Sequence, residues 1–338
     1  MSYVSALEKL RDLGMHGMVI SREGETVAEA VVRPYDLDRP HLAFSMTKSF
    51  ASMAAGFCVQ EGLLSLDDRA ASFFPDHLPP QPCEKIMRIT IRHLLMMATG
   101  HTKEPFFWPD EPEPLDAFFR SHAEAEPGSV FLYNTAGSHV LGYIIEKVSG
   151  LSLEDYLRPR LLDPLGMAGW IWDRHPDGTC MAGVGLHLKT RDIVKFGNFL
   201  LSEGAYGGKQ LIGADWIREA TAKHIVQPGE PGTERTSGYG YQFWRNLREG
   251  YRADGAFGQF CIVMPRRGMV VAMNSGTAAD MMDIMDVVFG ELLDALKAEK
   301  PGGLVTLDAP ADECDAQRRL RRMLVEETHW TYKDIMRG

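Results

Sequence analysis

The stretch His41-Leu-Ala-Phe-Ser45-Met-Thr-Lys48-Ser-Phe-Ala-Ser-Met-Ala-Ala-Gly56 is the starting point for interpreting this chain. A short extended segment leads into a helix, in which small and apolar residues follow Ser45. Residues three apart lie on one face of a helix, so the Ser45 hydroxyl and the Lys48 ammonium can meet. The apolar run that follows belongs in a core, where desolvation lowers the proton affinity of a lysine. The pattern predicts a nucleophilic serine beside a general base.

A structural interpretation of the same residues is a serine at a helix N-terminus, followed by a lysine whose charged end reaches solvent. Ser-x-x-Lys occurs once in the chain, which is about what chance gives at average composition. The catalytic interpretation therefore depends on partners elsewhere in the sequence.

Composition narrows the classes of function. The 338 residues are 45% hydrophobic and 24% charged, a globular profile long enough for one large or two interleaved domains. The net charge of −10 argues against nucleic acid or an anionic membrane as a partner. No apolar run approaches a membrane span, and the N-terminal residues lack the pattern of a secretory signal. The cysteines are scattered and never form a Cys-x-x-Cys pair, which favours reduced thiols. We therefore expect a cytoplasmic protein.

Hydrophobic periodicity predicts an alternation of strands and helices. Helices are expected over residues 2–13, 45–61, 89–97, 115–123, 137–148, 153–161, 190–203, 215–221 and 281–297. Strands are expected over residues 17–21, 26–32, 239–244, 258–265 and 269–274. Because strands at the two ends enclose a helical middle, the fold class is α/β (α+β), with an antiparallel sheet flanked by helices and an inserted, mostly helical layer.

The same pattern divides the chain into parts that together form one catalytic unit. Residues 1–60 and 236–300 are assigned to the sheet region, and residues 61–235 to the mostly helical region. Residues 301–338 are expected to be a tail packed on the outside. Ser45 lies where the first sheet segment meets the helical middle, and a cleft between two layers is a usual place for a small-molecule site.

Several motifs occur in order at familiar spacing, and together they resemble the serine β-lactamase and penicillin-binding-protein superfamily, in its class C-like branch of esterases, peptidases and amidases. The matching pieces are Phe44–Lys48, Gly62–Asp68, Ile91–Leu95, Thr99–His101, Phe131–Tyr133, Gly142–Gly150, Asp163–Met167, Thr190–Asp192 and Tyr239–Tyr241. The resemblance runs from about residue 17 to about residue 296. It implies a β-lactamase/transpeptidase-like fold.

The resemblance also implies roles for the matched positions. Ser45 is implied to be the acylated nucleophile and Lys48 the neighbouring base. Tyr133 is implied to move protons to the leaving group and to activate water. A phenol can act as a base near neutral pH only if cationic neighbours favour its anion, and Lys48 is the candidate neighbour. The backbone N–H groups of Ser45 and Ala256 are implied to form the oxyanion hole.

The sequence departs from the family in its second motif. The usual Tyr-x-Asn reads Tyr133-Asn134-Thr135, so the amide stands one position early. We expect substrate contact from a displaced Asn134 or, in its place, from the Thr135 hydroxyl.

A second departure lies in the third motif, which usually begins with a cation and reads Ala253-Asp254-Gly255 here. The cation that would hold a β-lactam or peptide carboxylate is missing. Arg252 could replace it, although a slip of one residue along a strand points a side chain to the other face. Asp254 and Gly255 are expected to line the substrate site. This motif favours esters or amides without an anion beside the scissile bond, or a cationic or hydroxyl-rich substrate.

Other residues are weaker candidates for the site. His187 follows a glycine-rich segment and is about equally compatible with substrate contact and with a surface or capping position. Trp108 and Trp244 are candidates for the wall of the acyl pocket, although aromatic residues are more often core. No His-Glu-x-x-His or cysteine-rich pattern indicates a metal, and no glycine-rich loop before a lysine indicates a nucleotide. No cofactor is expected.

The sequence thus predicts a serine hydrolase that cleaves a small-molecule ester or amide through an acyl-enzyme on Ser45, with no nucleic-acid or membrane partner. One alternative is a binding or sensing module of the same fold that is acylated without turnover. A third, less favoured hypothesis is a β-lactamase or D,D-peptidase in which Arg252 supplies the missing cation.

Overall fold

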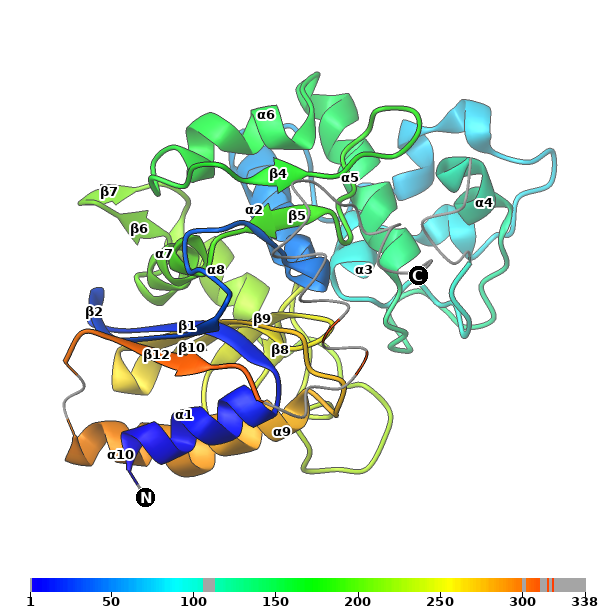
Figure 1. The fold of residues 1–338 in the computed structure, drawn as a ribbon. Helices are drawn as coiled ribbons and strands as arrows, with labels where there is room; N and C mark the ends of the chain where they lie inside the picture. Colours follow the sequence, from blue (N-terminus) through cyan, green and yellow to red (C-terminus); the bar gives the residue numbers. More distant parts are fainter. Residues whose placement is uncertain (1, 106–112, 300–301, 311–314, 316–317, 319–338) are drawn as a thin grey trace.

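The computed structural model describes residues 2–105, 113–299, 302–310, 315 and 318, and they form two layers (Figure 1). In this part of the chain seven strands form the main sheet. Their order is β12 (Leu304–Asp308), β2 (Glu25–Arg33), β1 (Met15–Arg22), β11 (Met269–Ser275), β10 (Gln259–Met264), β9 (Tyr251–Gly255) and β8 (Trp244–Arg245). All neighbouring strands are antiparallel except β12 and β2, which are parallel. The predicted sheet from both ends of the chain is confirmed.

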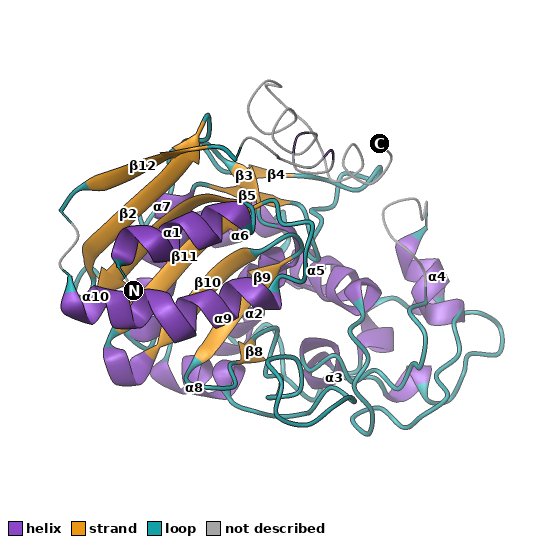
Figure 2. Cartoon of the chain, turned by 60° about the horizontal axis from the view of Figure 1, so that its bottom comes forward, coloured by secondary structure: helices purple, strands orange, loops and turns teal. Residues whose placement is uncertain are grey.

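Helices cover both faces of this sheet, so its central strands are apolar on both sides. Met18 and Ile20 of β1 pack in one cluster with the helices shown in front of the sheet in Figure 2. Those helices are α1 (Tyr3–Asp12), α9 (Met282–Val287) and α10 (Leu293–Ala298), the last two joined by a π-helical turn, Val288–Leu292. Val19, between them in sequence, packs in the other cluster, with α7 (Thr190–Leu201).

The second layer is mostly helical and surrounds α2 (Thr47–Gln60), whose residues from Thr47 to Cys58 are all buried. The other helices of this part are α3 (Ile91–Leu95), α4 (Pro114–Arg120), α5 (Thr135–Ser149), α6 (Leu153–Leu157) and α8 (Ala214–Thr221). Two small sheets complete it, one of β3 (His41–Leu42), β5 (Leu186–Leu188) and β4 (Ile171–Trp172), and one of β6 (Ala205–Tyr206) and β7 (Lys209–Gln210). None of the described helices is long and apolar enough to cross a membrane.

Three segments differ from the sequence prediction. The strand expected over 239–244 is wrong, because only Trp244 and Arg245 pair with β9. Gln242 has a φ of 65° and its N–H donates to Leu95 O in the helical layer, which interrupts an extended ladder. Strand β9 was not predicted, and residues 304–308, assigned to an outer tail, form the parallel edge strand β12. These pairings depend on partners distant in sequence, which local patterns do not specify.

Candidate active site

The turn into α2 brings Ser45 and Lys48 together. A 3₁₀ turn spans Phe44–Met46, and Phe44 has a φ of 49°, a conformation that non-glycine residues rarely adopt. The Lys48 ammonium donates to Ser45 Oγ at 2.9 Å and to Gly183 O at 2.7 Å. Only 1% of Lys48 is exposed. The two residues therefore meet as the helical spacing predicts, with the nitrogen of Lys48 held between a hydroxyl and a carbonyl.

The surroundings of Lys48 determine its protonation state. Burial lowers the pKa of Lys48 to about 7, while the negative charges of Glu104 and Asp254 oppose part of this effect. A lysine with this pKa has a large neutral fraction at physiological pH, and a neutral amine can accept the proton of a hydroxyl. Lys48 is thus equipped to serve as a general base for Ser45.

Tyr133 lies beside this pair, just before α5. The Lys48 Nζ atom is 5.0 Å from the centroid of the Tyr133 ring. The ring stacks on Trp244, with centroids 5.7 Å apart and planes 14° apart, and it meets the edge of Tyr239 at 6.3 Å. The structure therefore brings the three predicted catalytic side chains to one place and positions Trp244 behind the tyrosine.

The end of β9 forms the other side of the site. An added Cβ at Gly255 would lie 2.1 Å from Ala43 O, so the strand passes directly against the turn that carries Ser45. Ala256 follows and is exposed, and the ring of Phe257 lies 5.1 Å from that of Phe44. This close approach is compatible with the predicted use of the Ala256 N–H as an oxyanion donor.

Replacing Gly255 with alanine should lower both stability and activity, because a methyl group cannot occupy a position 2.1 Å from a carbonyl oxygen. We expect a loss of about 1–3 kcal/mol in the free energy of unfolding, as for overpacked sites, measured by urea denaturation. Gly290→Ala is the matched control, since an added Cβ there meets no heavy atom within 4 Å. Equal stability of the two variants would contradict the close approach.

The second-motif residues are used by the fold in a way that the sequence did not predict. Asn134 is fully buried and caps α5 by accepting the Gly137 N–H, and its amide donates to Thr99 Oγ1 at 3.3 Å. Its side chain is therefore not placed for substrate contact. Thr135 remains half-buried at the start of α5.

Glu104 and Gly183 were not predicted. The Glu104 carboxylate accepts the backbone N–H groups of Thr135 and Ala136 at 2.7 and 3.2 Å. Gly183 supplies the carbonyl that binds Lys48. Both act through contacts 30 or more residues apart in sequence. The only local signal for Glu104 is its position three residues after the Thr99–His101 motif.

His187 occupies the middle strand of the small sheet, β5. Its side chain is buried, and its Nε2 atom lies 3.2 Å from Asp173 Oδ1. Its burial contradicts the surface position, and substrate contact by His187 stays a prediction. It is an interior polar residue paired with an acid.

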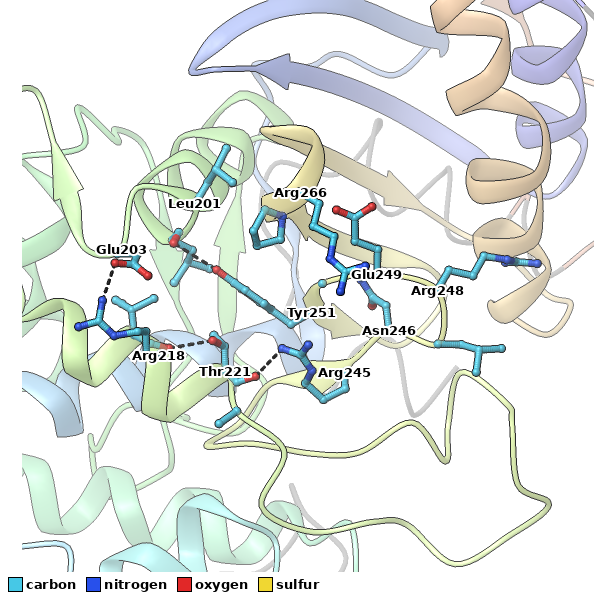
Figure 3. A pocket seen from close by; sticks show the side chains of 16 residues that line it. Leu201, Glu203, Arg218, Thr221, Arg245, Asn246, Arg248, Glu249, Tyr251 and Arg266 are labelled. Atoms are coloured by element: carbon cyan, nitrogen blue, oxygen red, sulfur yellow. Dashed lines mark hydrogen bonds and ion pairs between the residues drawn. The ribbon is translucent and has the colours of Figure 1, made fainter.

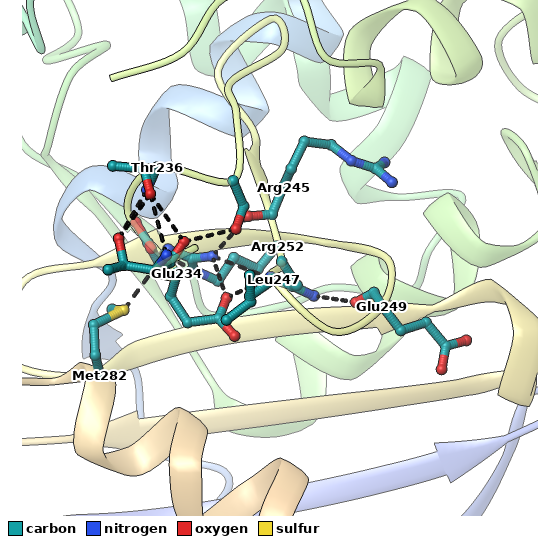
Figure 4. A network of polar contacts seen from close by, with 11 residues as sticks. Glu234, Thr236, Arg245, Leu247, Glu249, Arg252 and Met282 are labelled. Atoms are coloured by element: carbon teal, nitrogen blue, oxygen red, sulfur yellow. Dashed lines mark hydrogen bonds and ion pairs between the residues drawn. The ribbon is translucent and has the colours of Figure 1, made fainter. Parts of the chain in front are cut away.

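Arg252 belongs to a buried polar network (Figure 4), and it binds Asp254 of the same strand. The Arg252 guanidinium donates to Asp254 Oδ2 at 2.8 Å and to Asn246 Oδ1 at 3.2 Å, and it lies 3.5 Å from Glu234 Oε2. It is 1% exposed. Burial raises the pKa of Asp254, and the neighbouring Arg252 opposes that effect. The Arg252 side chain is thus bound by buried partners, and it does not replace the missing cation of the third motif.

Trp108 lies outside the described residues. Figure 3 shows a large hollow in the described part, about 500 Å³ and lined by Arg245, Glu249 and Tyr251 among others. Ser45 is not among its lining residues. Within the described ranges no three His, Cys, Asp or Glu side chains are arranged to hold a metal ion.

Comparisons with known proteins agree with this fold. The solved structure of a putative 6-aminohexanoate-dimer hydrolase from Bacillus anthracis superimposes with a TM-score of 0.72 at 23% identity, covering 88% of this chain and 83% of that one. A lovastatin esterase from Penicillium rubens is 28% identical over 42% of each chain. A putative D-alanyl-D-alanine carboxypeptidase from Escherichia coli is 27% identical over 47% of this chain and 40% of its own.

The chain spans about two fifths of the length of these curated relatives. The match to a protein family is broader and includes Ser45, Lys48, Tyr133 and Ala256. Because residues 5–286 match the beta-lactamase family, this chain belongs to that family.

Proposed function

We propose that the protein is a serine hydrolase that cleaves a small ester or amide through an acyl-enzyme on Ser45. The observation that carries the proposal is the hydrogen bond of 2.9 Å between Ser45 Oγ and a buried lysine. Burial lowers the pKa of that lysine to about 7. An activated nucleophile next to a matched base is the minimum requirement for acyl transfer.

The mechanism follows from these positions. Neutral Lys48 accepts the Ser45 proton as Oγ attacks the carbonyl carbon of the substrate, and the Ser45 and Ala256 N–H groups bind the resulting oxyanion. The tetrahedral intermediate collapses, and the alcohol or amine leaves with a proton delivered by way of Lys48 and Tyr133. Water then attacks the acyl-enzyme and gives a proton to the same pair, which passes it to Ser45 Oγ as the C–O bond breaks and the acid leaves.

The charges around the site support an uncharged acyl group as substrate. Arg252, the cation that stands within the third-motif strand, is paired with Asp254 and buried. A carboxylate beside the scissile bond would thus meet the acid Asp254, and Arg252 is not free to bind it. This favours ester cleavage, in line with the name of the Penicillium relative, over β-lactam or D,D-peptide hydrolysis.

A non-turnover acyl-binding module is the second candidate, because the second motif uses its asparagine as a helix cap. Stopped-flow hydrolysis of p-nitrophenyl acetate and butyrate, with intact-mass analysis of the quenched protein, separates the two. A burst, one acyl adduct per chain and steady turnover are expected for the hydrolase. A burst and a lasting adduct without turnover would instead establish the binding module.

The pH dependence of hydrolysis should follow the protonation state of Lys48. Its basic form predominates above its pKa of about 7, so kcat/KM for a neutral ester should rise with pH through that value and level off above it. Well below pH 7 each unit of pH should cost about tenfold in rate. A profile measured from pH 5 to 9 that stays flat through pH 7 would contradict Lys48 as the base.

We further propose a cytosolic location. Its support is that the described cysteines, Cys58, Cys83, Cys180 and Cys261, are all free thiols.

A further inference from the structure

Glu104 contacts the start of α5 beside the candidate site. The catalytic scheme above gives this residue no function. Its Oε1 atom accepts the Thr135 N–H at 2.7 Å and the Ala136 N–H at 3.2 Å. These are the first two residues of α5, where N–H groups lack partners within the helix. Tyr133 directly precedes the Asn134 cap, so the carboxylate fixes the segment that presents the tyrosine.

The same carboxylate is connected to Lys48 by contiguous packing. The Gly183 carbonyl accepts from Lys48 Nζ at 2.7 Å, and an added Cβ at Gly183 would lie 2.7 Å from Thr135 Cγ2. Glu104 holds the N–H of that threonine. A negative charge is thereby held on the α5 side of the lysine.

Other groups near Lys48 cannot provide this charge equally well. Asp254 on β9 is the second acid that favours its protonated form, but Arg252 is bound to that carboxylate at 2.8 Å. His139 on α5 is buried, and burial lowers its pKa well below the usual value, so it stays neutral. Tyr133 presents its ring, 5.0 Å from Nζ. Of the two acids that raise the pKa of Lys48, Glu104 is therefore the one that pairs with no cation among the residues the structure describes.

We propose that Glu104 is a positioning residue of this site: it holds the start of α5 and supplies the negative charge that keeps Lys48 an effective base. This inference rests on the proposed function. Burial alone would make the lysine too weak a proton acceptor, because a general base works best when its pKa lies near the operating pH. The charge of Glu104 counteracts that effect while its hydrogen bonds keep Tyr133 in place.

Glu104→Gln tests the charge, because the amide oxygen can still accept the two N–H groups. Removing an opposing charge should lower the pKa of Lys48, by roughly one unit for a neighbouring acid. The rising limb of the kcat/KM profile should move to lower pH by that amount. When the kcat/KM of each protein is divided by its own plateau value, the variant should exceed wild type by up to about tenfold well below pH 7. Glu104→Asp, which keeps the charge, should stay closer to wild type.

A titration of 13Cε-lysine-labelled protein by NMR supplies a readout that needs no turnover. The Lys48 signal, assigned by its loss in Lys48→Met, should titrate near pH 7 in wild type and lower in Glu104→Gln. Glu124→Gln is the matched control, since Glu124 also accepts a backbone N–H, from Thr102 at 3.0 Å, but does not act on Lys48.

The outcomes are distinguishable. An unchanged Lys48 midpoint in Glu104→Gln, or an equal shift in Glu124→Gln, overturns the inference. A shifted midpoint in a protein that neither hydrolyses nor retains any ester would overturn the proposed function and leave the electrostatic effect of Glu104 established.

Discussion

Ser45→Ala should abolish ester hydrolysis, with a loss of about 10⁴-fold or more in kcat, the scale observed when a serine nucleophile is removed elsewhere. No other group in the scheme can accept the acyl chain, so the adduct should disappear from the mass spectrum as well. Stopped-flow kinetics and intact mass measure the two losses on the same sample. Retained turnover would refute the covalent mechanism.

The fold should survive this substitution. Alanine keeps the backbone of the turn and removes one hydrogen bond, from Lys48 at 2.9 Å, which costs about 1 kcal/mol. Ser52→Ala is the matched control: Ser52 lies seven residues further along, buried in α2, and no partner for its hydroxyl is found among the described residues. Its activity and stability should remain near wild type. If both variants lost activity equally, the effect would come from the helix and not from the nucleophile.

Lys48→Met should also remove most activity, because methionine fills the same space but cannot take the Ser45 proton. Loss of a general base typically costs 10²–10⁴-fold, and we expect the upper part of that range, since Lys48 serves both acylation and deacylation. The burst rate and the steady rate with p-nitrophenyl butyrate should fall together. Loss of the steady rate alone would assign acylation to another base.

The same substitution should raise stability. Lowering the pKa of Lys48 from 10.5 to about 7 costs on the order of 4 kcal/mol of folding free energy at pH 7, while leaving Gly183 O unpaired costs about 1–3 kcal/mol. We therefore expect a net gain of about 2 kcal/mol in urea denaturation at pH 7. The folded pKa lies below the unfolded one, so wild-type stability should rise with pH between about 7 and 10.5 and the gain should shrink.

Lys297→Met is the control for this stability measurement. Lys297 is an exposed lysine whose ion pair with Asp294 is also exposed, so its replacement should change stability by less than about 0.5 kcal/mol. Destabilisation by Lys48→Met at pH 7 would mean that the buried nitrogen is held by stronger interactions than the two hydrogen bonds described above.

Much of this architecture could be predicted from local patterns. The antiparallel sheet from both chain ends, the helical insertion and the helices expected over residues 45–61 and 190–203 all followed from hydrophobic periodicity. The pairing of β12 with β2 could not, since the parallel partner lies 275 residues away, from Glu29 to Leu304, and neither segment carries a local signal for it.

In the candidate site, too, some features follow from the sequence alone and others only from the tertiary structure. The encounter of Ser45 and Lys48 is determined by the sequence, because a helical turn, here the 3₁₀ turn leading into α2, brings residues three apart to one face. The tertiary structure decided four other features of the site. These are the burial that lowers the pKa of Lys48, the capping function of Asn134, the pairing of Arg252 with Asp254 and the contact of Glu104 with α5. Each depends on which distant groups exclude water from a residue or bond to it, and that is a property of packing rather than of spacing along the chain.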